Sequence, residues 1–79
     1  MDHNQNINSC PLCREGQIIP MRVEKTSQLI LICDECDSQW DNPESVLLGK
    51  EPLEKEFQGK FSVLSEFELW QCGWYKYFK

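Results

Sequence analysis

The chain has 79 residues, of which 41% are hydrophobic and 27% charged, and its formal net charge is −5. These values exclude a multidomain or globally disordered protein, and no apolar run approaches the roughly 18 to 20 residues that span a membrane. The acidic charge repels nucleic-acid phosphates at long range and attracts basic partners. So small a domain buries only about 60% of its unfolded surface, so we expect its fold to need a cross-link.

Residues 1–8 are polar and are predicted to form a flexible tail. This segment lacks the basic flank and the apolar stretch of a secretory signal, so we expect a cytoplasmic chain with reduced cysteines. The five cysteines are an odd number, which a closed set of disulfides would not leave. Metal binding is therefore favoured over disulfide formation.

Residues 9–40 contain two Cys-x-x-Cys turns separated by nineteen residues. Between these turns, the strand-like runs 17–23 and 28–32 flank a polar turn at 24–27, which predicts a β-hairpin. Because Pro20 has no N–H to donate, the first strand is expected at a sheet edge, or bulged at that point.

The hairpin would return the second cysteine pair to the first. Two residues between the cysteines of a pair let one tight turn aim both sulfurs at the same point, and four thiolates at about 2.3 Å close a tetrahedron around zinc. The alternatives are reduced core cysteines or a redox dithiol pair, but a redox pair normally follows a strand of a β-α-β unit, and the sequence shows none. We predict one structural zinc ion, held by Cys10, Cys13, Cys33 and Cys36. A four-thiolate site leaves no position for a water molecule, so this zinc would not be catalytic.

Residues 41–49 predict a short helix. Asn42 suits the N-cap, Pro43 suits the first helical position, and Gly49 suits the stop. Residues 50–60 are mostly polar and charged and contain both proline and glycine, so we expect a loop there.

A second helix is expected to begin near Ser65, because its spacing from Glu68 matches a capping box. Gly73 is expected to end this helix, and residues 74–78 alternate like a short strand or a packed tail. Cys72 lies outside the metal pattern and is interpreted as a small buried apolar residue.

The aromatic residues gather in the second half of the chain. A helical stripe with intervals of three, three and four residues is formed by Leu64, Phe67, Trp70 and Trp74. We expect a second small core against the hairpin, built by Trp40, Phe61, Phe67 and Trp70. A chain of this size is not expected to bury all of the aromatics in residues 74–78, and three of them are candidates for partner contacts: Trp74, Tyr75 and Tyr77.

The stretch from Cys10 to Trp40, with its four cysteines and its hairpin, resembles the zinc-ribbon superfamily. The resemblance implies two zinc-binding Cys-x-x-Cys knuckles, although Arg14 and Asp37 stand where many ribbons have glycine. We therefore expect a small α+β fold, in which a zinc ribbon over residues 9–40 is followed by two short helices. Residues 41–79 would pack on the ribbon as part of a single domain.

A run of carboxylates with no intervening lysine or arginine surrounds the second cysteine pair: Asp34, Glu35, Asp37, Asp41 and Glu44. One interpretation is a solvated face, and the other is a docking surface for a basic protein. No catalytic constellation is visible, so we expect a binding protein and not an enzyme. In size and acidity the chain also loosely resembles bacterial immunity proteins, which implies that the partner would be a toxin.

The alternative function is that of a nucleic-acid-linked zinc-ribbon accessory factor in transcription or RNA handling. It requires a basic face, for which the sequence offers only a small edge made by Arg14, Arg22 and Lys25. We therefore expect no binding to nucleic acids or membranes.

Overall fold

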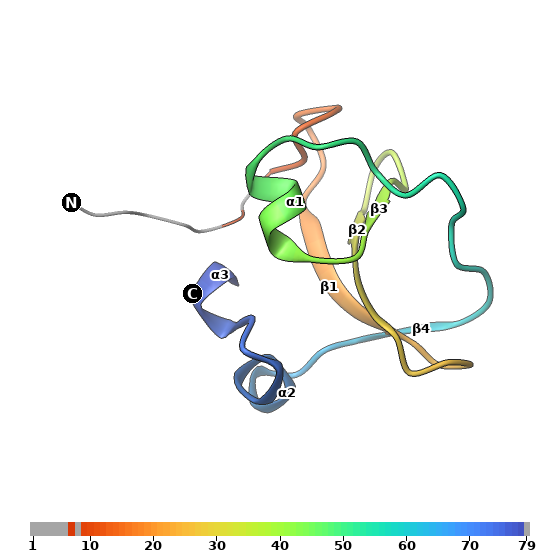
Figure 1. Cartoon of the computed structure of the whole chain (residues 1–79), viewed down its shortest axis with the longest axis vertical. Helices are drawn as coiled ribbons and strands as arrows, with labels where there is room; N and C mark the ends of the chain where they lie inside the picture. Colours follow the sequence, from red (N-terminus) through yellow and green to blue (C-terminus); the bar gives the residue numbers. More distant parts are fainter. Residues whose placement is uncertain (1–6, 8, 79) are drawn as a thin grey trace.

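The computed structural model describes Ile7 and residues 9–78 (Figure 1). Within these residues one antiparallel sheet has the strand order β3-β2-β1-β4, with β1 at Ile18–Val23, β2 at Leu29–Cys33, β3 at Gln39–Trp40 and β4 at Phe61–Val63. Short helices follow the hairpin, namely α1 at Pro43–Leu47, α2 at Glu66–Cys72 and α3 at Tyr75–Phe78. The fold is therefore α+β, as predicted. No helix in the described part of the chain is long and apolar enough to cross a membrane.

The predicted hairpin is confirmed and consists of β1 and β2. Ile18 pairs with Cys33 at one end of the ladder, and Arg22 pairs with Leu29 at the other. Both strands are rich in β-branched and leucine side chains, which pack well on a pleated surface. The register places Cys33 beside the start of β1, close to the first cysteine turn.

Pro20 does not lie in an edge strand, so that expectation was wrong. β1 is an interior strand, flanked by β2 and β4. The pairing with β4 ends where Met21 faces Val63, and the Pro20 carbonyl accepts the Leu64 N–H at 3.1 Å just beyond it. The N–H and C=O groups of one strand residue point to the same side of the strand. The nitrogen of Pro20 therefore faces the side of β4, at a point where β4 has already ended, and no hydrogen bond between paired strand residues is lost.

The two faces of the sheet carry separate apolar clusters. One face holds the cluster that includes the metal-site cysteines, and its buried members are Ile7, Cys10, Ile18, Leu31, Cys33, Trp40 and Val46. The opposite face holds Val23, Ile30 and Ile32, with Met21, Phe57 and Phe61 packed against them. In Figure 1 the helices lie on one side of the strands, and the long segment between α1 and β4 runs around the other side.

The segment between α1 and β4 has no regular structure, as predicted, and Gln39 fixes its position. This buried side chain donates from Nε2 to the Phe57 carbonyl at 3.2 Å and accepts the Phe57 N–H on Oε1 at 2.9 Å. The Gln39 carbonyl also accepts the Leu53 N–H at 2.7 Å. The side chain and the carbonyl of Gln39 therefore provide hydrogen-bond partners for the Phe57 and Leu53 backbone groups, in a segment that pairs with no strand.

We expect Gln39→Ala to lower the free energy of unfolding by about 2 kcal/mol, because two hydrogen bonds are lost and the Phe57 backbone groups are left unpaired. Denaturant unfolding of the metal-loaded protein measures this loss. Gln58→Ala, at an exposed position two residues before Lys60, is the matched control and should change little. Equal losses in the two variants would show that the Gln39 contacts contribute nothing.

Both predicted helix starts are confirmed. The Asn42 side chain accepts the Ser45 N–H at 2.9 Å, and Pro43 opens α1. At α2, Ser65 and Glu68 form the predicted capping box, and Gly73 ends the helix in the left-handed conformation with φ 83°. These signals act within one turn of the chain, so the sequence alone is enough to place them.

The predicted aromatic core is only partly correct. Trp40 is buried and donates from Nε1 to the Lys50 carbonyl at 3.0 Å, and Phe61 packs against the second cluster. Phe67 and Trp70, however, are 69% and 67% exposed. The helix instead turns Leu69 inward.

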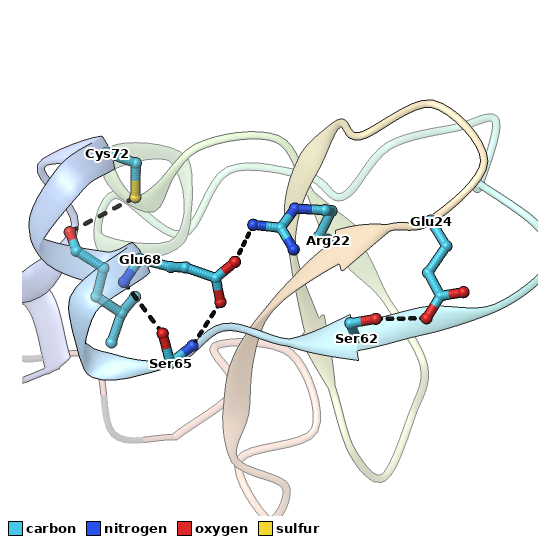
Figure 2. Close-up of polar contacts among 7 residues, drawn as sticks. Arg22, Glu24, Ser62, Ser65, Glu68 and Cys72 are labelled. Atoms are coloured by element: carbon cyan, nitrogen blue, oxygen red, sulfur yellow. Dashed lines mark hydrogen bonds and ion pairs between the residues drawn. The ribbon is translucent and has the colours of Figure 1, made fainter.

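Figure 2 shows the polar contacts of the inward face of α2. Arg22 of β1 forms an ion pair with Glu68, and the same carboxylate accepts the Ser65 N–H at 2.9 Å. Glu68 and Cys72 lie on the same helix face as the buried Leu69, and the opposite face, with the two aromatics, is left in solvent. Cys72 is half-buried, and its thiol lies 3.6 Å from the Leu69 carbonyl.

We expect Glu68→Gln to reduce stability at pH 7. The Ser65 N–H and then the Arg22 guanidinium hold the pKa of the Glu68 carboxyl below its usual 4.5. A carboxyl group whose pKa is lowered on folding stabilises the fold at any pH above its unfolded-state pKa. This stabilisation is lost as the pH falls through the folded-state pKa. The difference in the free energy of unfolding between parent and variant, measured with denaturant, should therefore persist from pH 7 down to about pH 5. It should shrink only at pH values below the usual pKa range of carboxyl groups.

Glu54→Gln, at an exposed position in the loop, serves as the control for Glu68→Gln and should match the parent at every pH. If the stability lost in Glu68→Gln became larger at lower pH, the assigned lowering of the Glu68 pKa would be wrong.

Of the two expectations for residues 74–78, the packed tail agrees with the structure and the strand does not. Tyr75–Phe78 form the short helix α3. Trp74 and Tyr77 pack against the metal-site cluster, and Tyr75 stacks on Trp70 with ring centroids 5.2 Å apart. All three predicted partner-binding aromatics are thus half-buried and lie partly within the fold.

The predicted flexible tail lies almost entirely outside the described residues. Ile7 is the exception, because it is buried in the metal-site cluster, and its N–H donates to the Tyr77 carbonyl at 2.7 Å. A residue assigned to the tail thus packs with the C-terminal helix.

Candidate metal centre

Four cysteines from two turns meet at one end of the β1–β2 hairpin. Cys10 and Cys13 belong to the turn before β1, Cys33 ends β2, and Cys36 follows in the next turn. Their four Sγ atoms all lie within 4.8 Å of one another. The structure therefore brings together the four residues that the spacing predicted.

The sulfur geometry fits a tetrahedral metal ion. Sγ of Cys10 lies 3.7 Å from Sγ of Cys36, and Sγ of Cys13 lies 3.6 Å from Sγ of Cys33. A disulfide needs about 2.05 Å, so these cysteines are free thiols. Four sulfurs placed about 2.3 Å from one zinc ion stand about 3.8 Å apart, which is close to the two observed distances. The four sulfurs therefore form a cluster that could hold a metal ion.

The two turns have the same backbone conformation. The Arg14 N–H donates to the Cys10 carbonyl at 3.0 Å, and the Asp37 N–H donates to the Cys33 carbonyl at 3.1 Å. Arg14 and Asp37 follow the second cysteine of each turn, with φ values of 62° and 63°. This left-handed region favours glycine, which explains why many ribbons have glycine there. Here the turn forms without it, at the cost of some strain.

Backbone N–H groups point at the sulfurs. Leu12 donates to Cys10 Sγ at 3.3 Å, Gly16 donates to Cys13 Sγ at 3.4 Å, and both Glu35 and Cys36 donate to Cys33 Sγ at 3.4 Å. Such donors stabilise thiolates and orient them toward a common centre. The amide dipoles therefore prepare the site for a cation.

The thiols differ in acidity for clear reasons. The Ser38 hydroxyl, 3.3 Å from Cys36 Sγ, lowers the pKa of that thiol to about 7, and the Glu15 and Gly16 N–H groups lower the pKa of Cys13. Burial raises the pKa of the Cys33 thiol to about 12. Hydrogen bonds thus favour the thiolate forms of Cys13 and Cys36. The buried Cys33 thiolate needs the positive charge of a metal ion to balance it.

Gly16 belongs to the site, although it was not predicted as a site residue. Its carbonyl accepts the Cys10 N–H at 2.9 Å, and its α-carbon lies against the opposite turn. A Cβ added there would stand 2.5 Å from Cys33 Sγ and 2.8 Å from Glu35 Cβ. Glycine is therefore needed at the third position after the second cysteine, because the two turns approach each other closely there. This spacing is a sequence signal that could have identified Gly16.

Asp34 also has a structural task. Its Oδ1 accepts the Gln17 N–H at 2.8 Å, and its own N–H donates to the Gln17 carbonyl at 3.0 Å. These bonds fasten the second cysteine turn to the start of β1. Asp34 is exposed, as expected, and one of its oxygens is also committed to the fold.

The five predicted docking carboxylates are all exposed: Asp34, Glu35, Asp37, Asp41 and Glu44. Asp41 accepts a hydrogen bond from the Asn42 amide at 2.9 Å. Among the predicted aromatics, Tyr77 lines a shallow depression of about 250 Å³ with one of these carboxylates, Glu44, and with Leu47 and Leu48. The other two predicted aromatics do not line this depression.

Comparisons with family models, with curated proteins and with solved structures find no match to this chain. Its function is therefore inferred from its own residues.

Proposed function

We propose that this chain is a non-catalytic zinc-ribbon protein that uses an acidic face to bind a basic protein partner. One observation supports it above the others: four convergent sulfurs adjoin a run of exposed carboxylates that no basic residue interrupts. Zinc is the ion that a closed four-thiolate tetrahedron favours. With four thiolates and one divalent ion, the net charge falls to about −7, which further favours a basic partner.

The charge distribution supports a protein partner over nucleic acid. The small basic edge of the alternative function depends on Arg14, Arg22 and Lys25. Arg22 is paired with Glu68, so its charge is largely neutralised. What remains does not make the basic stripe that phosphate binding requires.

The partner can be sought directly with two double variants that carry the same change in charge. Glu35→Lys/Glu44→Lys alters the acidic face, and Glu51→Lys/Glu54→Lys alters the exposed loop. The immobilised, zinc-loaded parent should capture a basic protein from the native host at low salt, and capture should weaken as salt rises. The loop variant should capture it equally well, and the acidic-face variant should lose most of it. Equal capture by all three chains would refute the acidic-docking mechanism.

The narrower version, an immunity protein that neutralises a bacterial toxin, stays a prediction. Co-expression with the product of the neighbouring gene tests it. Formation of a complex that suppresses the toxicity of that product would support this version, and a non-toxic neighbour would remove it.

A further inference from the structure

The second face of the sheet carries a cleft of about 380 Å³ between the strands and the segment that leads to β4. Its floor and wall are apolar and include Ile19 and Ile32 of the hairpin and Phe57 of the segment. Its rim carries Asp34, Asp37 and Glu56, and no lysine or arginine is among its lining residues. The cleft thus combines an apolar interior with a purely acidic edge.

The walls of this cleft are held in place before any ligand arrives. Gln39 holds the Phe57 backbone through two hydrogen bonds. The Asp34 carboxylate accepts the Gln17 N–H, which holds it at the edge of the cleft. A ligand therefore meets one carboxylate and one aromatic wall that need little ordering, which lowers the entropic cost of binding.

We propose that this cleft receives an arginine side chain of the basic protein partner. The assignment rests on the proposed function and specifies where its key contact lies. Charge complementarity selects a cation, and the apolar floor suits the methylene stem that such a side chain buries. Arginine fits better than lysine, because its weakly hydrated planar head can stack on Phe57 while it pairs with carboxylates at the rim.

The test is an NMR titration of the zinc-loaded, ¹⁵N-labelled chain with an acetylated tetra-arginine amide. We expect the amide signals of Ile19, Ile32 and Phe57 to shift. Asp37→Asn/Glu56→Gln should raise the dissociation constant about tenfold, which corresponds to ~1.4 kcal/mol. Both replacements keep the side-chain shape, and asparagine tolerates the left-handed backbone at position 37, so the fold should be retained. Glu51→Gln/Glu54→Gln is the control with the same loss of charge and should change the constant less than twofold.

The other outcomes separate the cleft from the proposed function. Signal shifts confined to the region of Glu35, Asp41 and Glu44, with unchanged affinity in the cleft variant, would overturn the cleft assignment and leave the acidic docking face standing. Equal affinity for tetra-lysine would overturn the choice of arginine. No binding of either peptide would also overturn the cleft, and the capture experiment would then decide the proposed function independently.

Discussion

Cys33→Ser should abolish stoichiometric zinc binding and unfold the hairpin unit. Cys33 is a fully buried member of the metal-site cluster, and burial raises the pKa of its thiol to about 12, so its thiolate needs a cation to balance its charge. Structural zinc supplies about 10 to 16 kcal/mol in zinc-finger peptides, which matches or exceeds the ~5 to 15 kcal/mol net stability of a typical domain. Elemental analysis of the purified variant and circular dichroism during chelation of the parent measure both effects.

Cys72→Ser is the control for this experiment. Cys72 lies on α2, outside the sulfur cluster, and is only half-buried. The variant should bind as much zinc as the parent and unfold cooperatively. If Cys33→Ser retained one tightly bound zinc ion and a folded hairpin, the four-thiolate site would be wrong.

Gly16→Ala should be the most damaging substitution that leaves all four cysteines in place. The added methyl group would lie 2.5 Å from a ligand sulfur, so one of the two turns must move away from the metal centre. We expect a loss of about 3 kcal/mol in the free energy of unfolding, at the upper end of overpacking effects, together with weaker zinc binding. Competition with a chelator and denaturant unfolding measure the two losses.

Gly49→Ala provides the matched control for Gly16→Ala. No atom lies within 4 Å of its would-be Cβ, and only its φ of 69° opposes alanine. We expect a cost of about 1 kcal/mol from backbone strain and no change in zinc affinity. Comparable losses of zinc affinity in the two variants would show that close approach at Gly16 is unimportant.

The features that the sequence predicted well depend on local chemistry. The cysteine spacing determines where each turn lies, and the hairpin between the turns brings their sulfurs together. The capping box at Ser65 and Glu68 likewise acts within one helical turn. Such signals can be recognised from neighbouring residues alone, because the rest of the fold does not alter them.

The features that the sequence missed depend on contacts between distant segments. The inward face of α2 carries Leu69 and the ion pair between Glu68 and Arg22 of the distant strand β1, so the aromatic stripe with Phe67 and Trp70 gave the wrong core. The extra strand β4 pairs with β1 across a long loop, which no local pattern announces.

The structural tasks of Gly16 and Asp34 were not predicted, for the same reason. Gly16 and Asp34 act on the turn opposite to their own, so their tasks become visible only when the hairpin is closed.

Zinc K-edge X-ray absorption on the purified chain tests the central claim most directly. The geometry of the sulfur cluster predicts one zinc ion per chain with four sulfur neighbours at about 2.3 Å and no nitrogen or oxygen in its first coordination shell. A chain that is folded without metal, or a zinc ion with oxygen or nitrogen ligands in place of any of the four sulfurs, would contradict it.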